Sequence, residues 1–375
     1  MTSKQILPAE NICKHKPDWE EVKERFNAWW QRSSLDRPLI HIRGLRKSPL
    51  SPLSEVPVPG SFGDRYLNIE RLILIKRNQM SAEVFLAEAL PALDLMLGPG
   101  SLAVYLGSQP IFDAATVWFS HAVEDWQTFG SLKFDPDNPW LRRHLDMFEQ
   151  AIQLTEGEFL INIPDLCEGV DILSSLRDPQ RFCYDLIDES ELMLDYVHQL
   201  DELYFKYYDM FWNLSRPADK SSGYSAFTIW GPGRTAKVQC DFAAMMSPSQ
   251  FRDFAQPSLR KQCQTLDHSL FHLDGTDALR HLDALLEIEE LDALQWTAGY
   301  GKPGAWDECW DEIYRKAKDA GKSLWIIVGG STIDEVEARA RRLTRKFGRD
   351  GLYLVILEVF PEAEARRLIK NSEKW

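Results

Sequence analysis

Short apolar runs alternate with longer helical patterns through most of this 375-residue chain, and this alternation limits the folds that it can adopt. Beyond a breaker at Gly98-Pro99-Gly100, the runs typical of strands are Ser101–Leu106, Phe159–Ile163, Ser225–Trp230, Leu270–Leu273, Ala293–Trp296, Ser323–Val328 and Leu352–Leu357. Patterns typical of helices separate most of them, at residues 138–155, 177–214, 247–266, 276–288, 305–320 and 332–348. A repeated β–α order predicts a parallel sheet with helices outside it.

About seven or eight β–α units over this length favour a closed (β/α)8 barrel, a TIM barrel, with a helical N-terminal extension. The alternative is an open doubly wound sheet, which usually has a Gly-rich phosphate turn after its first strand. No G-x-G-x-x-G motif stands in that place. We therefore expect one α/β structural domain, in which residues 61–375 form the barrel and residues 1–60 an extension packed on it.

The extension has a pronounced aromatic pattern. Residues 17–32 predict an amphipathic helix whose apolar face consists of Trp19, Val22, Phe26, Trp29 and Trp30. Such a face suits either the core or the interface of a homodimer. The segments that follow along the chain predict a strand (Arg37–Arg43), a Pro- and Ser-rich loop or lid (Ser48–Gly63) and a helix (residues 69–96).

The net charge and the spacing of the cysteines limit the kinds of protein that this chain can be. The chain has 43 basic and 57 acidic residues and a net charge of −14, so general binding to nucleic acid is not expected. The six cysteines are dispersed without a C-x-x-C pair, which favours free thiols in a reducing cytoplasm. The first 18 residues lack the apolar core of a signal peptide, and no apolar stretch is long enough to cross a membrane.

The most informative pair of residues follows a predicted strand. Alternation places His272 and Asp274 on the same side of the strand, directly before Gly275. In a barrel the active site lies at the carboxyl ends of the strands. Histidine and aspartate serve both as metal ligands and as acid–base groups, while the alternative is a hydrogen-bonded pair that only stabilises the loop.

Other strand ends also carry chemistry-bearing residues. Cys240 and Asp241 end an extended run, and Asp165 leaves another strand together with Cys167 and Glu168. Each has a structural alternative: Asp165 as a helix cap, and Cys240 as a small buried residue beside a loop aspartate. The residues expected to contact substrate are Trp230, Arg234, Trp296, Tyr300 and Asp165. For the tryptophans core packing is the alternative, and Glu358, which ends the last strand, could equally face solvent.

Several short motifs in order resemble the uroporphyrinogen decarboxylase superfamily. They are Cys240-Asp241-Phe242, Ser247-Pro248, Phe251, Phe254, Pro257, His272-Leu273-Asp274-Gly275 and the later LDALQWTAGYGKP loop. The resemblance covers roughly residues 60–365 and implies a (β/α)8 barrel. Methyltransferases of this superfamily carry a zinc ion on a His-x-Cys motif and a second Cys near the last strand, and move methyl groups to or from a corrinoid protein.

The chain departs from that pattern. Asp274 stands where the family has Cys, Glu358 stands near the other expected Cys, and no Cys follows Cys309. The resemblance therefore implies zinc or another divalent metal on His272, Asp274, Glu358 and Cys240, a harder donor set than two thiolates. The Arg-Gln-Ala-Gly-Arg segment of the decarboxylase itself is replaced by RPLIHIRGLRK, and with a net charge of −14 we disfavour the haem-pathway reaction.

The leading hypothesis is a cytoplasmic metal-dependent methyltransferase that acts on a small methylated substrate or a corrinoid protein. Its catalytic residues would be His272, Asp274 and Asp241. A second hypothesis is a metal-free decarboxylase or lyase of a small acid, in which Asp241 stabilises a cation and His272 moves a proton. A third is a ligand-binding barrel without catalytic activity, because both expected cysteines are missing.

Overall fold

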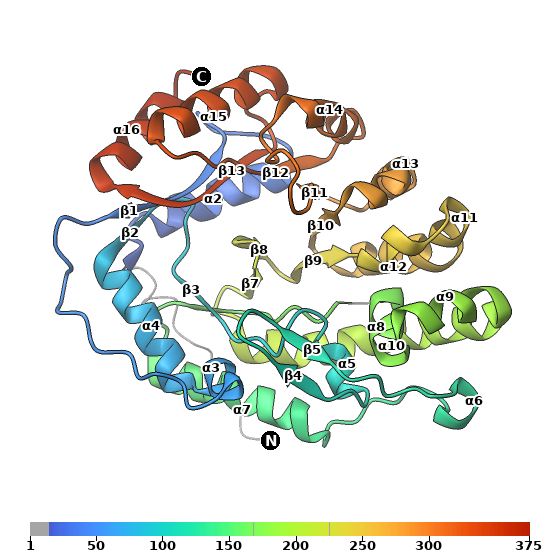
Figure 1. Ribbon diagram of the computed structural model, residues 1–375. Coiled ribbons are helices and arrows are strands. Elements are labelled where there is room, and N and C mark those ends of the chain that lie inside the picture. Colours follow the sequence, from blue (N-terminus) through green and yellow to red (C-terminus); the bar gives the residue numbers. More distant parts are fainter. Residues whose placement is uncertain (1–14, 168, 225) are drawn as a thin grey trace.

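The computed structural model describes residues 15–167, 169–224 and 226–375 (Figure 1). Its α-helices are α2 (Trp19–Trp30), α3 (Phe62–Leu67), α4 (Ile69–Ala82), α5 (Leu102–Tyr105), α6 (Trp126–Phe129), α7 (Pro139–Thr155), α8 (Gly169–Arg177), α9 (Pro179–Asp188), α10 (Ser190–Ser215), α11 (Pro248–Gln250), α12 (Gln256–Thr265), α13 (Leu282–Leu286), α14 (Asp311–Asp319), α15 (Ile333–Phe347) and α16 (Glu362–Ser372). A π-helical turn, Phe251–Ala255, joins α11 to α12, and 3-10 turns span Asp241–Met245, Thr276–His281 and Glu308–Trp310.

The strands are β1 (Leu39–Leu45), β2 (Glu83–Ala87), β3 (Ala92–Asp94), β4 (Pro110–Phe112), β5 (Val117–Phe119), β6 (Leu160–Asn162), β7 (Ser221–Tyr224), β8 (Ile229–Pro232), β9 (Thr235–Gln239), β10 (His268–Asp274), β11 (Ala293–Thr297), β12 (Ser323–Ile327) and β13 (Leu352–Pro361). Seven of them form the central sheet in the order β2-β1-β13-β12-β11-β10-β9. All neighbours in it are parallel except β1 and β2. The carboxyl ends of the parallel strands therefore lie at one edge.

Three two-stranded pairs accompany the sheet: β3 with β6, β4 with β5, and β7 with β8. An isolated parallel bridge pairs Ile163, which directly follows β6, with Tyr224, the last residue of β7. Within the described residues, these pairings make a mixed α/β fold with a central parallel sheet. They do not join the strands into a closed ring of eight.

The aromatic face of α2 is buried. Trp19, Phe26, Trp29 and Trp30 are each no more than 2% exposed. The indole of Trp30 stacks on His268, the first residue of β10, and donates to the carbonyl of Trp230 at 2.9 Å. The indole of Trp29 donates to the carbonyl of Leu324, near the start of β12, at 3.3 Å. Helix α2 thus covers the amino ends of the strands, and its aromatic face belongs to the core instead of a dimer interface.

Two segments differ from the expected elements. Ser101–Leu106 was expected as a strand, but Leu102–Tyr105 form helix α5, whose residues are all buried. A short apolar run that is buried on all sides shows no alternation of apolar and polar residues. Its pattern therefore does not distinguish a helix from a strand. Residues 69–96 are not one helix either: α4 ends at Ala82, and the chain continues as β2 and β3.

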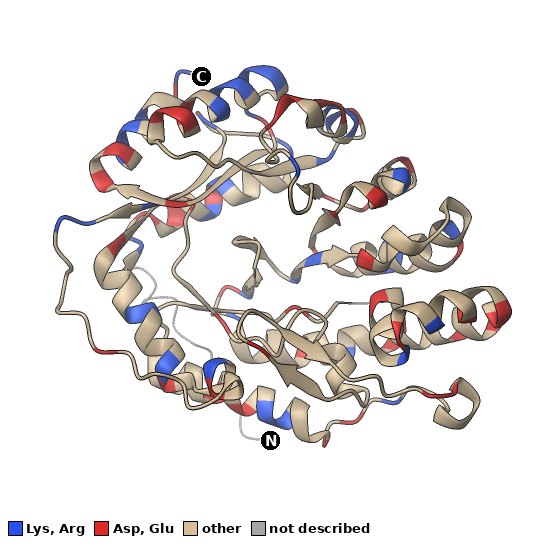
Figure 2. Cartoon of the chain, viewed as in Figure 1, with Lys and Arg blue, Asp and Glu red and all other residues tan. Residues whose placement is uncertain are grey.

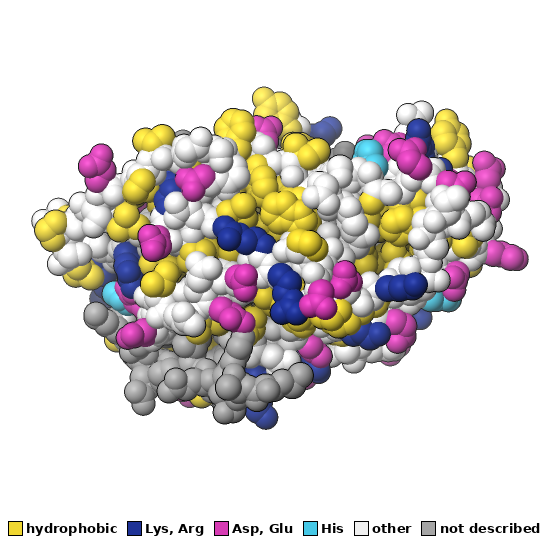
Figure 3. Space-filling view, turned by 90° about the horizontal axis from the view of Figure 1, so that it is seen from below, with side chains coloured by type: hydrophobic (Ala, Val, Ile, Leu, Met, Phe, Trp, Pro, Cys, Tyr) yellow, Lys and Arg dark blue, Asp and Glu magenta, His cyan; other side chains and the backbone are white. Residues whose placement is uncertain are grey.

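Charged residues are concentrated on helices and loops, and the strands are largely uncharged (Figure 2). On the face seen in Figure 3, apolar side chains are interspersed with acidic and basic ones. Among the described helices, none combines the length and the apolar character that crossing a membrane requires.

Candidate functional site

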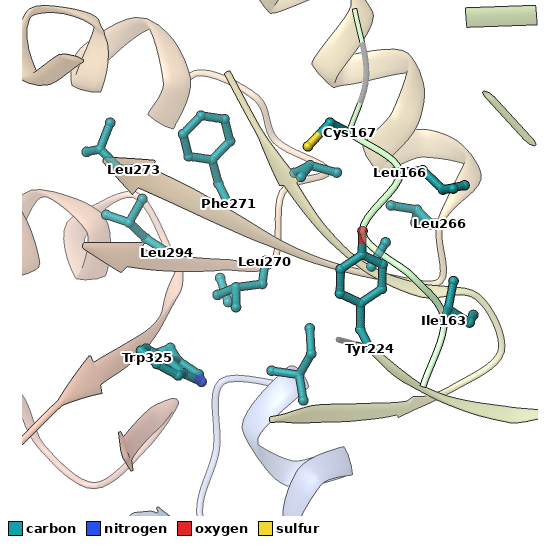
Figure 4. Close-up of a cluster of buried hydrophobic side chains, with 14 of the residues drawn as sticks. Ile163, Leu166, Cys167, Tyr224, Leu266, Leu270, Phe271, Leu273, Leu294 and Trp325 are labelled. Atoms are coloured by element: carbon teal, nitrogen blue, oxygen red, sulfur yellow. The ribbon is translucent and has the colours of Figure 1, made fainter. Parts of the chain in front are cut away.

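The carboxyl ends of β9, β10 and β11 bring polar side chains together. The parallel register places His272 opposite Gln239 of β9 and opposite Gln295 of β11. It also places Asp274 opposite Thr297. Because side chains alternate along a strand, His272 and Asp274 lie on the same side of β10 as Leu270, and Figure 4 shows Phe271 and Leu273 on the other side.

Three residues form a group that can hold a metal ion. One ligand atom each from Asp241, His272 and Asp274 lies within 4.8 Å of the others. His272 and Asp274 come from the end of β10, and Asp241 follows the end of β9. Two carboxylates and an imidazole are a donor set for zinc or another divalent cation, and a triad leaves coordination positions for a substrate.

The ring of His272 is oriented by its neighbour on β11. Its Nδ1 is hydrogen-bonded to Oε1 of Gln295, whose amide nitrogen donates to the hydroxyl of Thr297 at 2.8 Å. Since an amide oxygen only accepts, Nδ1 carries the proton and Nε2 is the nitrogen with a free lone pair. Burial, and then the positive charge of Lys237, lower the pKa of His272, which favours the neutral imidazole that binds metals.

Asp241 is held at the corner after β9. Its backbone N–H donates to Asp171 at 2.9 Å, that of Phe242 donates to the same carboxylate at 2.8 Å, and the amide of Gln239 reaches Asp241 at 3.1 Å. Desolvation and then the neighbouring charge of Asp171 raise the pKa of Asp241 to about 7. A cation bound beside Asp241 would remove this penalty, because it stabilises the ionised form.

A buried ion pair lies next to this group. Nζ of Lys237 is 2.8 Å from Oδ2 of Asp165, and both side chains are almost completely buried. The other carboxylate oxygen of Asp165 accepts from the hydroxyl of Tyr224 at 3.2 Å and from Sγ of Cys167 at 3.4 Å. Lys237 also donates to the amide oxygen of Gln239, whose amide nitrogen donates to Asp241. Gln239 thus connects the buried ion pair to Asp241. Figure 4 shows Cys167 and Tyr224 on neighbouring segments.

A hollow of about 290 Å³ opens beside these residues. Its lining includes Cys167, Asp171, Gln239 and Asp241, together with apolar groups such as Ile172. Pockets that bind small molecules combine an apolar lining with a few placed polar groups, and this hollow has that composition.

Other residues expected at the site lie elsewhere. Trp230 is buried beneath α2, where its ring packs edge-on against Trp19 at 5.4 Å. Trp296 points away from the site between Gln295 and Thr297 and packs on Trp310 at 5.2 Å. Both tryptophans therefore pack in the core. For Trp296 this follows because neighbours along a strand face opposite sides of the sheet.

Arg234 and Tyr300 are also separate from the group. Arg234 precedes β9, at the amino end of the sheet, and pairs with Asp209 at 2.8 and 3.0 Å. Tyr300 is fully exposed on the loop after β11.

The two remaining expected metal ligands are not part of the triad. Cys240 is buried between β9 and the 3-10 turn, and it is not among the residues whose ligand atoms converge. Glu358 is exposed, and its carboxylate accepts from the backbone N–H of Gly330 at 3.3 Å. Of the site residues expected from the sequence, the structure brings together Asp241, His272 and Asp274, and places Asp165 close by. Glu168 lies outside the described residues.

The structure adds four residues to those expected from the sequence: Lys237, Gln239, Asp171 and Gln295. For two of them a signal existed: Lys237 and Gln239 precede Asp241 at a spacing of two residues, just as His272 precedes Asp274. Gln295 contacts His272 through the register between two strands, and Asp171 comes from a helix far earlier in the chain. Neither relation is visible in a local pattern.

No known protein family and no curated protein matches this sequence. Among solved structures, the fold is similar to that of a methyltransferase from Methanosarcina mazei, with a TM-score of 0.64. The two sequences are 12% identical, and the match covers 94% of this chain and 98% of the other. At this identity the likeness establishes a shared fold, while the superfamily suggested by the motifs is not confirmed.

Proposed function

We propose that this chain is a metal-dependent methyltransferase with a divalent cation on Asp241, His272 and Asp274. The observation that carries the proposal is the approach of their three ligand atoms to within 4.8 Å at the carboxyl ends of β9 and β10. The fold shared with a methyltransferase supports it. We further propose that the sheet and the β3–β6 and β7–β8 pairs together correspond to a (β/α)8 barrel. Since β1 (Leu39–Leu45) lies inside the sheet, one strand of this barrel comes from the expected extension, residues 1–60.

The residues present fit a metal. Gln295 fixes the proton of His272 on Nδ1 and leaves Nε2 available, and two carboxylates supply the negative charge that a divalent cation requires. A divalent cation acts as a Lewis acid that can hold and polarise the methyl acceptor or the leaving group. Asp171 and Gln239 keep Asp241 in place, and the buried Lys237–Asp165 pair is linked to Gln239 through the hydrogen bond that Lys237 donates.

A small methylated compound suits the hollow of about 290 Å³ beside Asp241. The methyl group would be exchanged with a second reactant, for which we propose a corrinoid carried on a partner protein. The donor set has no thiolate, so it favours oxygen or nitrogen groups on the reactant that it binds.

The first experiment is the metal content of the purified protein by elemental analysis. We expect about one divalent ion per chain in the wild type, and loss of that ion in His272→Ala/Asp274→Ala. Glu358→Gln is the matched control, because this carboxylate lies outside the triad and its variant should keep the metal. A wild type that neither contains a divalent ion nor takes one up would overturn the metal site.

The reaction is tested separately. We would follow loss of the methyl group from methylcobalamin spectroscopically, with small alcohols, amines and thiols as acceptors. Turnover in the wild type and its loss in the folded double variant are expected. Equal turnover in both proteins would contradict the proposed role of the triad.

One observation favours a second candidate, a metal-free lyase or decarboxylase of a small acid. The pKa of Asp241 is raised to about 7, a value suited to exchange of a proton near neutral pH. Activity on a small carboxylic acid that survives exhaustive chelation would favour this candidate over methyl transfer.

A further inference from the structure

A groove with a volume of about 760 Å³ lies between the segment that leaves β1 and the start of α16. Leu45, Arg46 and Lys47 form one wall, and Glu362 and Arg366 contribute to the other. Because Leu45 pairs in parallel with Pro361, the groove lies at the carboxyl ends of β1 and β13. This is the edge of the sheet at which His272 and Asp274 also lie.

The groove is locally basic on an acidic chain. Within the described residues, neither Arg46 nor Lys47 has an acidic group within the 4.0 Å of an ion pair, and Nε of Arg46 is buried without a hydrogen-bond partner. Arg366 is paired with Glu362 at 2.7 Å. Three cations and one carboxylate line the groove, although the whole chain carries a net charge of −14. In Figure 2 the segment that leaves β1 is blue beside α16.

The same groove exposes large apolar side chains. Leu45 is 51% exposed and Leu50 is 64% exposed, and both line it. Exposed leucines beside unpaired cations match the composition of a protein-binding surface, where apolar anchors are surrounded by charged groups that select the partner. A free phosphate would pair with the cations but would leave Leu45 and Leu50 exposed to solvent. The two leucines therefore favour a peptide over a small anion as the ligand.

We propose that this groove receives an acidic segment of a partner protein. Carboxylates of the segment would pair with Arg46 and Lys47, and an apolar side chain would cover Leu45 and Leu50. A partner bound there lies at the edge of the sheet that carries the triad. The inference rests on the groove alone and holds whether or not the triad binds a metal.

The probe is a fluorescein-labelled peptide of ten residues in which Glu and Leu alternate. We expect fluorescence anisotropy to show saturable binding to the wild-type protein that weakens as salt is added. Arg46→Glu/Lys47→Glu should weaken binding at least tenfold. The control Lys370→Glu/Lys374→Glu makes the same change of charge on exposed residues near the C-terminus, outside the groove, and should stay within twofold of the wild type. All four positions lie at or near the surface, and circular dichroism melts confirm that each variant folds.

The apolar contribution is measured with Leu50→Ser and with a second peptide in which Ser replaces Leu. The Leu50→Ser variant should bind the Glu–Leu peptide more weakly than the wild type does. The wild type should bind the Ser peptide more weakly than the Glu–Leu peptide. The proposal is overturned if the wild type does not bind the Glu–Leu peptide, or if both charge-reversal variants lose binding equally. It is also overturned if the Ser peptide binds as well as the Leu peptide and inorganic phosphate displaces both, since the groove would then be a site for small anions.

Discussion

The imidazole of His272 has one nitrogen committed to Gln295, and this single hydrogen bond decides which nitrogen faces the carboxylates of Asp241 and Asp274. An imidazole without that partner could turn its ring or move its proton. The free energy of metal binding would then include the cost of ordering the ring. Gln295 is itself buried and held by Thr297, so the orientation is fixed before any ligand arrives.

We therefore expect Gln295→Leu to weaken metal binding by roughly tenfold, the lower end of the effect of such outer partners. Gln295→Glu keeps an acceptor oxygen beside Nδ1 and should retain most of the affinity. Competition with a chromophoric zinc chelator measures both. The same affinity in the Leu variant as in the wild type would show that Gln295 does not position His272.

At the level of elements, a buried histidine connects α5 and α7. Nδ1 of His144 and the hydroxyl of Tyr105 are 2.6 Å apart, and Nε2 lies 2.9 Å from the carbonyl of Leu95. The carbonyl can only accept, so Nε2–H donates to it and the tyrosine hydroxyl donates to Nδ1. Both nitrogens are thus used by the neutral ring, and burial lowers the pKa of His144 to about 4.

This predicts a specific loss of stability in acid. The folded protein binds the proton of His144 less readily than the unfolded chain, whose histidine pKa is 6.5. The contribution is therefore complete above about pH 6.5 and is lost as the pH falls toward 4, by about 3 kcal/mol. Denaturant unfolding of the wild type and of His144→Gln between pH 7 and 4 measures it as the difference between the two profiles, because burial also lowers the pKa of His41 to about 3 and that of His268 to about 4. Tyr105→Phe, which keeps the imidazole, should lower stability but keep the pH dependence.

Helix α2 supports a second prediction at this scale. Trp30→Ala removes a buried indole that stacks on His268 and donates to the carbonyl of Trp230, and should destabilise the protein by about 3–5 kcal/mol. Trp118→Ala removes an indole that is 62% exposed and should change stability by less than about 0.5 kcal/mol. Urea unfolding compares the two variants. Similar losses for both would mean that the face of α2 is not part of the core.

The elements with clear periodicity could be predicted from the sequence. The strand near Leu270–Leu273 and the helix over residues 17–32 follow from alternation and from the spacing of aromatic residues. The run Ser101–Leu106 could not be assigned, because burial on all sides removes the period. For the candidate site, alternation within β10 related His272 to Asp274, whereas the contact of His272 with Gln295 depends on how two strands pair. Local patterns do not contain that register.

At the scale of the whole molecule, the triad joins the ends of two strands that are already paired along their length. A metal bound there adds its binding energy to the stability of the folded state, since the unfolded chain does not hold the three groups together. At 100 times the dissociation constant this amounts to about 2.7 kcal/mol. The unfolding entropy of a chain of 375 residues converts it to a rise in Tm of only about 3 °C.

Calorimetry with increasing zinc tests this prediction without knowledge of the substrate. The metal-free wild type should gain about 3 °C, and a chelator should reverse the gain. His272→Ala/Asp274→Ala should show no rise at the same zinc concentrations, while Glu358→Gln should respond like the wild type. Zinc also binds cysteines of unfolded chains, which would lower Tm in all variants alike, so the difference between variants carries the information. A rise of the same size in the double variant would show that the metal binds elsewhere. The stabilisation by zinc would then not come from the residues at the ends of β9 and β10.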